Sequence, residues 1–267
     1  MPGAPPCARK LARQRESGDE RSPGYAWHEA IIAGGSIKLE NDFDALKRAA
    51  GDAAAADVKD GMVVGLGSGS TAAFAVSALG RRVAEGLRIV GIPTSERTAA
   101  QARTLKIPLT TLKEHPEIDI DIDGADEVEK GTLNLIKGGG GALLREKIVA
   151  SASKRFLVIV DESKLVGRLG EKFAVPVEAA PFGWPVVARA LRNLHCEPTL
   201  RLKPDGSEFF TDGGNCILDC SFGPIADPVA LGREIDGIAG VVEHGLFLGM
   251  TSRVIVGATT GVLQYSK

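Results

Sequence analysis

Short apolar runs alternate with amphipathic stretches between residues 42 and 170. The apolar runs, each with the length of a strand, lie at 62–64, 87–92, 107–112, 118–122, 133–136 and 156–160. Helical spacing or helix-starting residue types predict helices at 42–57 and 141–153, a helix after residue 71 with Val76, Leu79 and Val83 on one face, and a helix that starts at Thr94-Ser95-Glu96. Regular alternation of strand and helix is typical of a mostly parallel sheet with helices on both faces. The pattern therefore predicts an α/β fold with a Rossmann-like sheet flanked by helices.

The pattern changes after residue 170. Strands are predicted at 175–178, 198–202, 216–218 and 241–247, with helices at 185–194 and from Asp227-Pro228 onward. The resulting order, β-α-β-β-α-β, is ferredoxin-like. A further strand at 253–256 could return to the first sheet. We therefore expect a catalytic α/β domain at 39–170 plus 248–267, with a small α+β domain at 171–247. Residues 1–38 lack periodicity and are predicted to be a disordered extension.

Composition excludes several classes of function. The 267 residues include 44% hydrophobic and 25% charged residues, and the net charge is −2. No basic run indicates a nucleic-acid partner, and no apolar run reaches the length of a membrane span. Four cysteines, at positions 7, 196, 216 and 220, lack zinc-ligand spacing. We expect free thiols in a reducing compartment, hence a cytoplasmic protein, with no metal and no cofactor.

The segment 135–147 holds the most informative chemistry. Lys137 precedes four consecutive glycines, and Glu146 follows on the second turn of the predicted helix. Glycine amides can approach a ligand closely, so a cation, N–H donors and a carboxylate converge there. That combination suits a reaction that passes through an oxyanion and moves one proton. A lysine at a strand end is often only solvated, but ordinary turns rarely need four glycines.

A second glycine-rich loop, Gly65–Thr71, lies between a predicted strand and helix. Its amides and the hydroxyls of Ser68, Ser70 and Thr71 suit an anion at a helix N-terminus. A Walker loop would need a Gly-Lys pair, and a dinucleotide loop would need a glycine where Ser70 stands. A single phosphate is the better interpretation, with a plain tight turn as the alternative.

Aspartate and isoleucine alternate from Asp119 to Asp123. One interpretation is a strand with one wet face. However, Asp126 follows directly, at the carboxyl end of the strand, where ligands gather in open α/β sheets. Carboxylates such as Asp123 and Asp126 near a lysine could hold hydroxyls and move protons. Lys164, taken alone, fits a surface lysine.

Several motifs together resemble the type A ribose-5-phosphate isomerases. They are Gly-Leu-Gly-Ser-Gly-Ser-Thr at 65–71, Asp-Gly-Ala-Asp-Glu at 123–127, Lys-Gly-Gly-Gly-Gly-Ala-Leu with Arg-Glu-Lys at 137–147, Gly-Asn-Cys-Ile-Leu-Asp at 214–219, and Gly-Val-Val-Glu with Gly-Leu-Phe at 240–247. The resemblance runs from about Asp42 to the C-terminus. Ser68 stands where many members have threonine, and His244 where a small or polar residue is expected.

The resemblance implies interconversion of ribose 5-phosphate and ribulose 5-phosphate through an enediolate. It implies that Glu146 is the proton-transferring base. It also implies that Asp123 and Asp126 bind the sugar and assist ring opening, and that Lys137 lines the site. The implied substrate-binding residues are Lys47, Ser68, Gly69, Ser70, Thr71, Gly124, Ala125, Gly138, Gly139, Gly140 and Lys164. A homodimer or homotetramer is expected. The alternative is a non-catalytic sugar-phosphate sensor on the same fold; the lysine-glycine motif disfavours a related deaminase or lactonase.

Overall fold

The computed structural model of the chain describes residues 30–31 and 43–266. The predicted extension at 1–38 lies outside these ranges, apart from the two residues of β1 (Ala30–Ile31), which pair with the last strand. Among the helices of the described ranges, none combines the length and hydropathy needed to cross a bilayer.

The main sheet has the order β1-β15-β14-β7-β4-β2-β3. Its further strands are β2 (Val63–Leu66), β3 (Val90–Pro93), β4 (Ile120–Asp123), β7 (Phe156–Asp161), β14 (Arg253–Ala258) and β15 (Gly261–Ser266). From β14 to β3 all neighbours are parallel, whereas β15 and β1 add antiparallel pairs at one edge. The mostly parallel sheet predicted from the sequence is confirmed.

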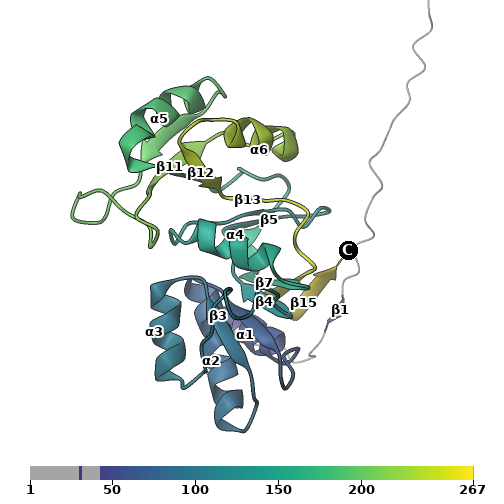
Figure 1. Cartoon of the computed structure of the whole chain (residues 1–267). Coiled ribbons are helices and arrows are strands. Elements are labelled where there is room, and N and C mark those ends of the chain that lie inside the picture. The colour runs from purple at the N-terminus through teal and green to yellow at the C-terminus, as the bar shows by residue number, and fades with distance from the viewer. Residues whose placement is uncertain (1–29, 32–42, 267) are drawn as a thin grey trace, which may run out of the picture.

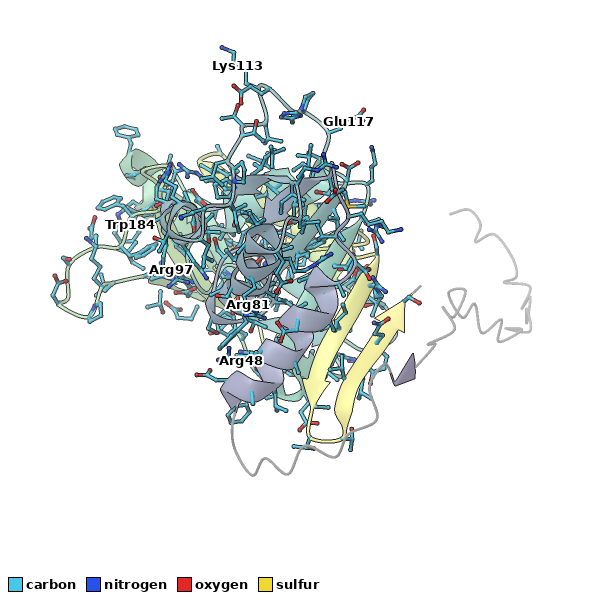
Figure 2. All side chains as sticks on the ribbon, turned by 90° about the horizontal axis from the view of Figure 1, so that it is seen from below. Arg48, Arg81, Arg97, Lys113, Glu117 and Trp184 are labelled. Carbon is cyan, nitrogen blue, oxygen red and sulfur yellow. The ribbon has the colours of Figure 1, made fainter. Side chains whose placement is uncertain are left out.

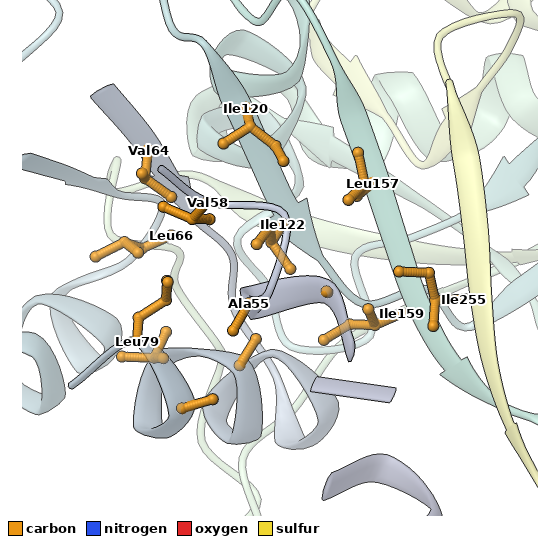
Figure 3. Packing of buried hydrophobic residues seen from close by; sticks show 14 of the residues in the cluster. Ala55, Val58, Val64, Leu66, Leu79, Ile120, Ile122, Leu157, Ile159 and Ile255 are labelled. Carbon is orange, nitrogen blue, oxygen red and sulfur yellow. The ribbon is translucent and has the colours of Figure 1, made fainter. Parts of the chain in front are cut away.

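Helices cover both faces of this sheet (Figure 1). They are α1 (Phe43–Ala55), α2 (Ser70–Ala84), α3 (Glu96–Thr104) and α4 (Leu143–Ser151). On one face, α1 and α2 pack against Ile120, Ile122 and Ile159 in the largest apolar cluster (Figure 3). On the other face, α4 places Val149 and Ala150 against the sheet. Because β4 is covered on both sides, its aspartates face protein rather than water.

A second, antiparallel sheet has the order β10-β11-β9-β12. Its elements are β9 (Val175–Ala179), α5 (Trp184–Arg192), β10 (Glu197–Leu200), β11 (Cys216–Ser221), α6 (Pro228–Asp236) and β12 (Val241–His244). Both helices pack on one apolar cluster with this sheet, and Asp227 caps α6 by accepting from the amides of Val229 and Ala230. The chain order and strand order are those of the ferredoxin-like arrangement. We propose that this unit, residues 171–247, is inserted into a domain formed by 39–170 and 248–267.

The predicted strand at 107–112 is wrong. Only Leu109 forms a bridge, to Gly91 of β3, and the chain then turns toward exposed residues that include Lys113 and Glu117 (Figure 2). Pro108 has no N–H, so this segment cannot extend a full ladder along β3.

The single strand predicted at 241–247 is also wrong, because the chain divides at Gly245. Its second part, β13 (Leu246–Phe247), belongs to a third sheet, β13-β6-β5-β8. The other strands there are β5 (Glu127–Glu129), β6 (Leu135–Ile136) and β8 (Leu165–Val166). At Gly245 a Cβ would lie 2.3 Å from the carbonyl oxygen of Lys137, so only glycine permits this close passage. The strands β5, β8 and β15 were not predicted.

The contact between α1 and β14 depends on a missing side chain. A Cβ on Gly257 would lie 2.0 Å from the backbone oxygen of Leu46. We expect Gly257→Ala to lower the free energy of unfolding by about 1–3 kcal/mol, the usual range for overpacking. Gly183→Ala is the control, since a Cβ there meets nothing within 4 Å. Urea denaturation of both variants tests this; equal stability of the two would contradict the packing described.

Candidate active site

A cavity of about 80 Å³ lies where the glycine-rich loops meet. Its lining residues are Ser68, Gly69, Ser70, Thr71, Gly124, Ala125, Asp126, Lys137, Gly138, Gly139, Gly140, Glu146 and Lys164. The loops after β2, β4 and β6 supply most of them. Segments nearly 100 residues apart in the sequence therefore converge at the carboxyl ends of strands, as expected for ligand sites in α/β sheets.

Lys137 is the centre of the polar contacts in this cavity. It follows β6 and is only 2% exposed. Its ammonium lies 2.9 Å from Asp123 Oδ2 and 3.4 Å from Glu146 Oε2, and it donates to the Gly124 carbonyl at 2.5 Å. Burial alone would lower the pKa of Lys137, but the two carboxylates raise it above its usual value. The lysine is therefore a fixed positive charge.

Glu146 projects from the first turn of α4 and lines the cavity. Its side chain is buried, with the ion pair to Lys137 as its one polar contact among the described residues. Burial raises the pKa of Glu146 to about 8; Lys137 opposes the shift, and Asp123 and Asp126 add to it. A carboxyl group with a pKa near 8 can both accept and return a proton at neutral pH.

Asp123 lies behind the cavity rather than in its lining. Its Oδ1 accepts hydrogen bonds from the amides of Ser68 and Gly124, and its Oδ2 faces Lys137. A Cβ on Gly67 would fall 2.2 Å from this carboxylate, which explains the glycine at that position. Burial raises the pKa of Asp123 and Lys137 lowers it, leaving a net upward shift. Asp123 thus joins the two loops and holds Lys137.

Asp121 is a buried carboxyl group whose importance the sequence did not indicate. It lies on the same face of β4 as Asp123, is fully buried, and neither of its oxygens has a hydrogen-bond partner among the described residues. Burial, and next the charge of Asp123, raise its pKa well above the usual value. Its burial and the charge of Asp123 therefore favour the neutral form of Asp121, which limits the negative charge beneath the site.

Asp126 contacts the glycine-rich loop directly. Its Oδ2 accepts from the Gly139 amide at 2.8 Å, and it also lines the cavity. The neighbouring Glu127 has a structural role instead, because its carboxylate accepts from the amides of Gly170, Lys172 and Phe173. Of the carboxylates of Asp123, Asp126 and Glu127, that of Asp126 is the one that lines the cavity.

The Ser68–Thr71 loop divides into two parts. The Ser68 hydroxyl points to Thr94, Ser95 and Thr98, with oxygen distances of 2.7–3.2 Å. Ser70 and Thr71 instead begin α2, whose N-terminus has no side-chain cap. Lys164 lines the same cavity and forms no ion pair within the described ranges. Uncapped N–H groups and a cation together suit an anion.

Lys47 is not among the residues that line the cavity. It lies on α1, with its ammonium 3.8 Å from Asp44. Its predicted place near the phosphate stays a prediction.

One group of described residues has atoms close enough to hold a metal ion. Asp236, Glu243 and His244 each offer a ligand atom within 4.8 Å of the others. However, the Lys147 ammonium already lies 2.5 Å from Glu243 Oε1, and the group is outside the glycine-rich cavity. A larger cavity of about 430 Å³, between α3 and α4, has a mainly apolar lining and contains none of the predicted residues.

The fold and the site define a class of α/β proteins in which a buried carboxyl group and a lysine lie beside glycine-rich loops and an uncapped helix N-terminus. Comparison with known proteins then gives the family. The profile of ribose 5-phosphate isomerase A (phosphoriboisomerase A) matches residues 90–261. Ribose-5-phosphate isomerase A from Gloeobacter violaceus is 60% identical over 83% of this chain and 96% of its own, and that from Synechococcus sp. is 54% identical over 82% and 96%. The chain belongs to the ribose 5-phosphate isomerase A family.

Solved structures agree. The enzyme from Methanocaldococcus jannaschii has a TM-score of 0.81 and 47% identity, covering 84% of this chain and 99% of that one. A D-ribose-5-phosphate isomerase in complex with phospho-erythronic acid has a TM-score of 0.82 and 38% identity, covering 85% and 100%. The predicted fold class is therefore confirmed.

The raised pKa of Glu146 predicts a pH dependence. Only the carboxylate accepts a proton, so below pH 8 the competent fraction falls about tenfold per pH unit. We expect kcat/KM to rise with pH between 6 and 7.5 and to level above about 8. The substrate phosphate titrates near pH 6 and cannot produce that limb. Initial rates over pH 5.5–9 test this, with circular dichroism to verify folding; a flat profile between pH 6.5 and 8.5 would contradict it.

Proposed function

We propose that this chain interconverts D-ribose 5-phosphate and D-ribulose 5-phosphate through an enediolate, in the non-oxidative branch of the pentose phosphate pathway. The observation that carries the proposal is Glu146: a buried carboxyl group that lines the cavity, pairs with Lys137 and has a pKa of about 8. The reaction needs one group that takes a proton from C2 and returns it to C1. Glu146 has the location and the proton affinity for both steps.

The oxyanion of the enediolate would be stabilised mainly by glycine amides. Lys137 has Asp123, Glu146 and the Gly124 carbonyl as partners, so it contributes charge and holds Glu146 in place. The Gly140 N–H, by contrast, has no acceptor within the described part of the chain, and Gly140 lines the cavity. A fixed N–H donor in a small, partly closed cavity stabilises developing negative charge effectively.

The sugar hydroxyls would bind Asp126, whose side chain lines the cavity and whose Oδ1 accepts no hydrogen bond from the described residues. Asp126 could therefore assist ring opening. Asp123 would act through Lys137 and the Ser68 and Gly124 amides, because it is fully buried. The substrate phosphate would lie at the N-terminus of α2, near Ser70, Thr71 and Lys164.

The alternative function, a non-catalytic sugar-phosphate sensor, is not supported. The relatives and solved structures that match along most of this chain carry the name of the isomerase. The base and its lysine partner are both present, whereas a sensor would need only the phosphate loop. We also propose a cytoplasmic location, because the thiols of Cys196, Cys216 and Cys220 are free and buried. A homodimer or homotetramer is proposed as well, as the resemblance implies.

The first test of this function removes the base. We expect Glu146→Gln to keep the fold and the affinity for phospho-erythronic acid but to lower kcat by about 100- to 10,000-fold, the usual loss for a general base. Glu117→Gln, on an exposed loop (Figure 2), is the control and should match the wild type. Retention of more than about a tenth of the wild-type rate would rule out Glu146 as the base.

The second test concerns the phosphate. Free ribose should be poorer than ribose 5-phosphate by several orders of magnitude in kcat/KM, since the phosphate orients the open chain. Replacing Ser70 and Thr71 with alanine should slow ribose 5-phosphate far more than ribose. Ser77→Ala, on the same helix with its hydroxyl bonded to the Ala73 carbonyl, is the control. Equal slowing of both sugars would place the anion site elsewhere.

A further inference from the structure

We propose that Arg201, from the small domain, is a positioning residue that orients the Gly139–Gly140 peptide so that its N–H faces the substrate. The inference rests on the proposed isomerase function and extends it to a residue outside the glycine-rich loops. Arg201 follows β10, more than 60 residues after the glycines it contacts.

The guanidinium of Arg201 connects two structures. It donates to both carboxylate oxygens of Asp219 on β11, through Nε at 2.9 Å and through its Nη2. The Nη1 donates to the carbonyls of Gly138 at 2.8 Å and of Gly139 at 3.2 Å. Arginine presents its donors in a rigid planar fork, so the bidentate contact with Asp219 fixes where Nη1 points.

The direction of the two carbonyls decides the direction of the following amides. In a trans peptide the C=O and the next N–H lie on opposite sides. The Gly138 carbonyl points to Arg201, and the Gly139 N–H accordingly points the other way, to Asp126. The Gly139 carbonyl also accepts a hydrogen bond from Arg201. By the same geometry, the Gly140 N–H points away from the small domain and toward the cavity that Gly140 lines.

Glycine peptides would otherwise turn over easily, because they lack the steric restriction of a Cβ. Two further contacts limit this loop. Asp126 holds the Gly139 amide on one side, and on the other the ring of Phe209 lies where a Cβ of Gly141 would be. The Arg201 guanidinium is 5.9 Å from the centre of the same ring. Arg201 is the cationic member of this support, and it acts on the peptide that carries the free donor.

The experiment compares transition-state and ground-state readouts in Arg201→Met. We expect kcat to fall about 10- to 100-fold, somewhat less than for deletion of an oxyanion donor, with KM for ribose 5-phosphate within about threefold. The carboxylate of phospho-erythronic acid resembles the enediolate oxygens. We therefore expect its inhibition constant to rise by the same factor by which kcat/KM falls. The inhibition constant of inorganic phosphate should stay within twofold, because that anion needs only the α2 end of the site.

Two variants complete the design. Arg192→Met removes an exposed arginine of the same domain, paired with Glu197, and should leave every constant unchanged. Asp219→Asn keeps the guanidinium but weakens the contact that holds it, and should lower kcat about 3- to 10-fold. The inhibition constant of phospho-erythronic acid should again rise while that of inorganic phosphate stays nearly unchanged. Asp219→Asn also decides the matter if Arg201→Met does not fold.

Each outcome of these measurements bears either on the role of Arg201 or on the proposed function. A folded Arg201→Met with kcat within twofold of the wild type would overturn the inference. So would an equal weakening of phosphate and phospho-erythronic acid, which indicates general damage to the site. Wild-type protein that does not turn over ribose 5-phosphate would instead overturn the proposed function, so the two failures are distinguishable.

Discussion

The structure of the site depends on one buried ammonium group. Lys137 is surrounded by Asp123, Glu146 and a backbone carbonyl, and removal of charges from water is tolerated only where partners compensate. One lysine cannot neutralise Asp121, Asp123 and Glu146 together. The cluster must therefore retain protons, and the raised pKa values of all three acids express this. The affinity of Glu146 for a proton is thus a property of the whole cluster.

The same constraint explains why the loops have so many glycines. Asp123 reaches Lys137 from beneath the Gly65–Thr71 loop, and it can do so only because Gly67 leaves room for its carboxylate. Gly245 likewise lets the chain from the small domain pass against the Lys137 carbonyl, where its own carbonyl accepts from the Lys137 N–H. These glycines serve packing around the ion cluster, whereas Gly139 and Gly140 line the cavity.

Much of the fold could be predicted because hydrophobic periodicity reports burial directly. The isoleucines of β4 and the apolar run of β7 are core residues, and their spacing is local information. The two-residue strand β8 carries no such period, and the break between β12 and β13 follows from a contact of Gly245 with a distant carbonyl. For the site, motifs located the residues that line the cavity. Burial of Asp121 and Asp123 could not be read from the sequence, because α4 covers their face only in the folded chain.

The two domains have different roles in the site, because the glycine run needs contacts from outside to fix its conformation. In the large domain, α4 fixes Glu146 and the parallel strand β2 leads into the N-terminus of α2, while Lys137 follows β6, which pairs with antiparallel neighbours. A glycine run cannot fix itself, since each of its peptides has several accessible orientations. Contacts from outside must therefore restrict it, and they come from Asp126 on one side and from Arg201 and Phe209 on the other. A small domain that supplies no lining residue to the cavity can thus still determine the direction of an amide that faces the cavity. The ion pairs of Lys147 with Glu243 and of Arg145 with Asp212 hold that domain against α4.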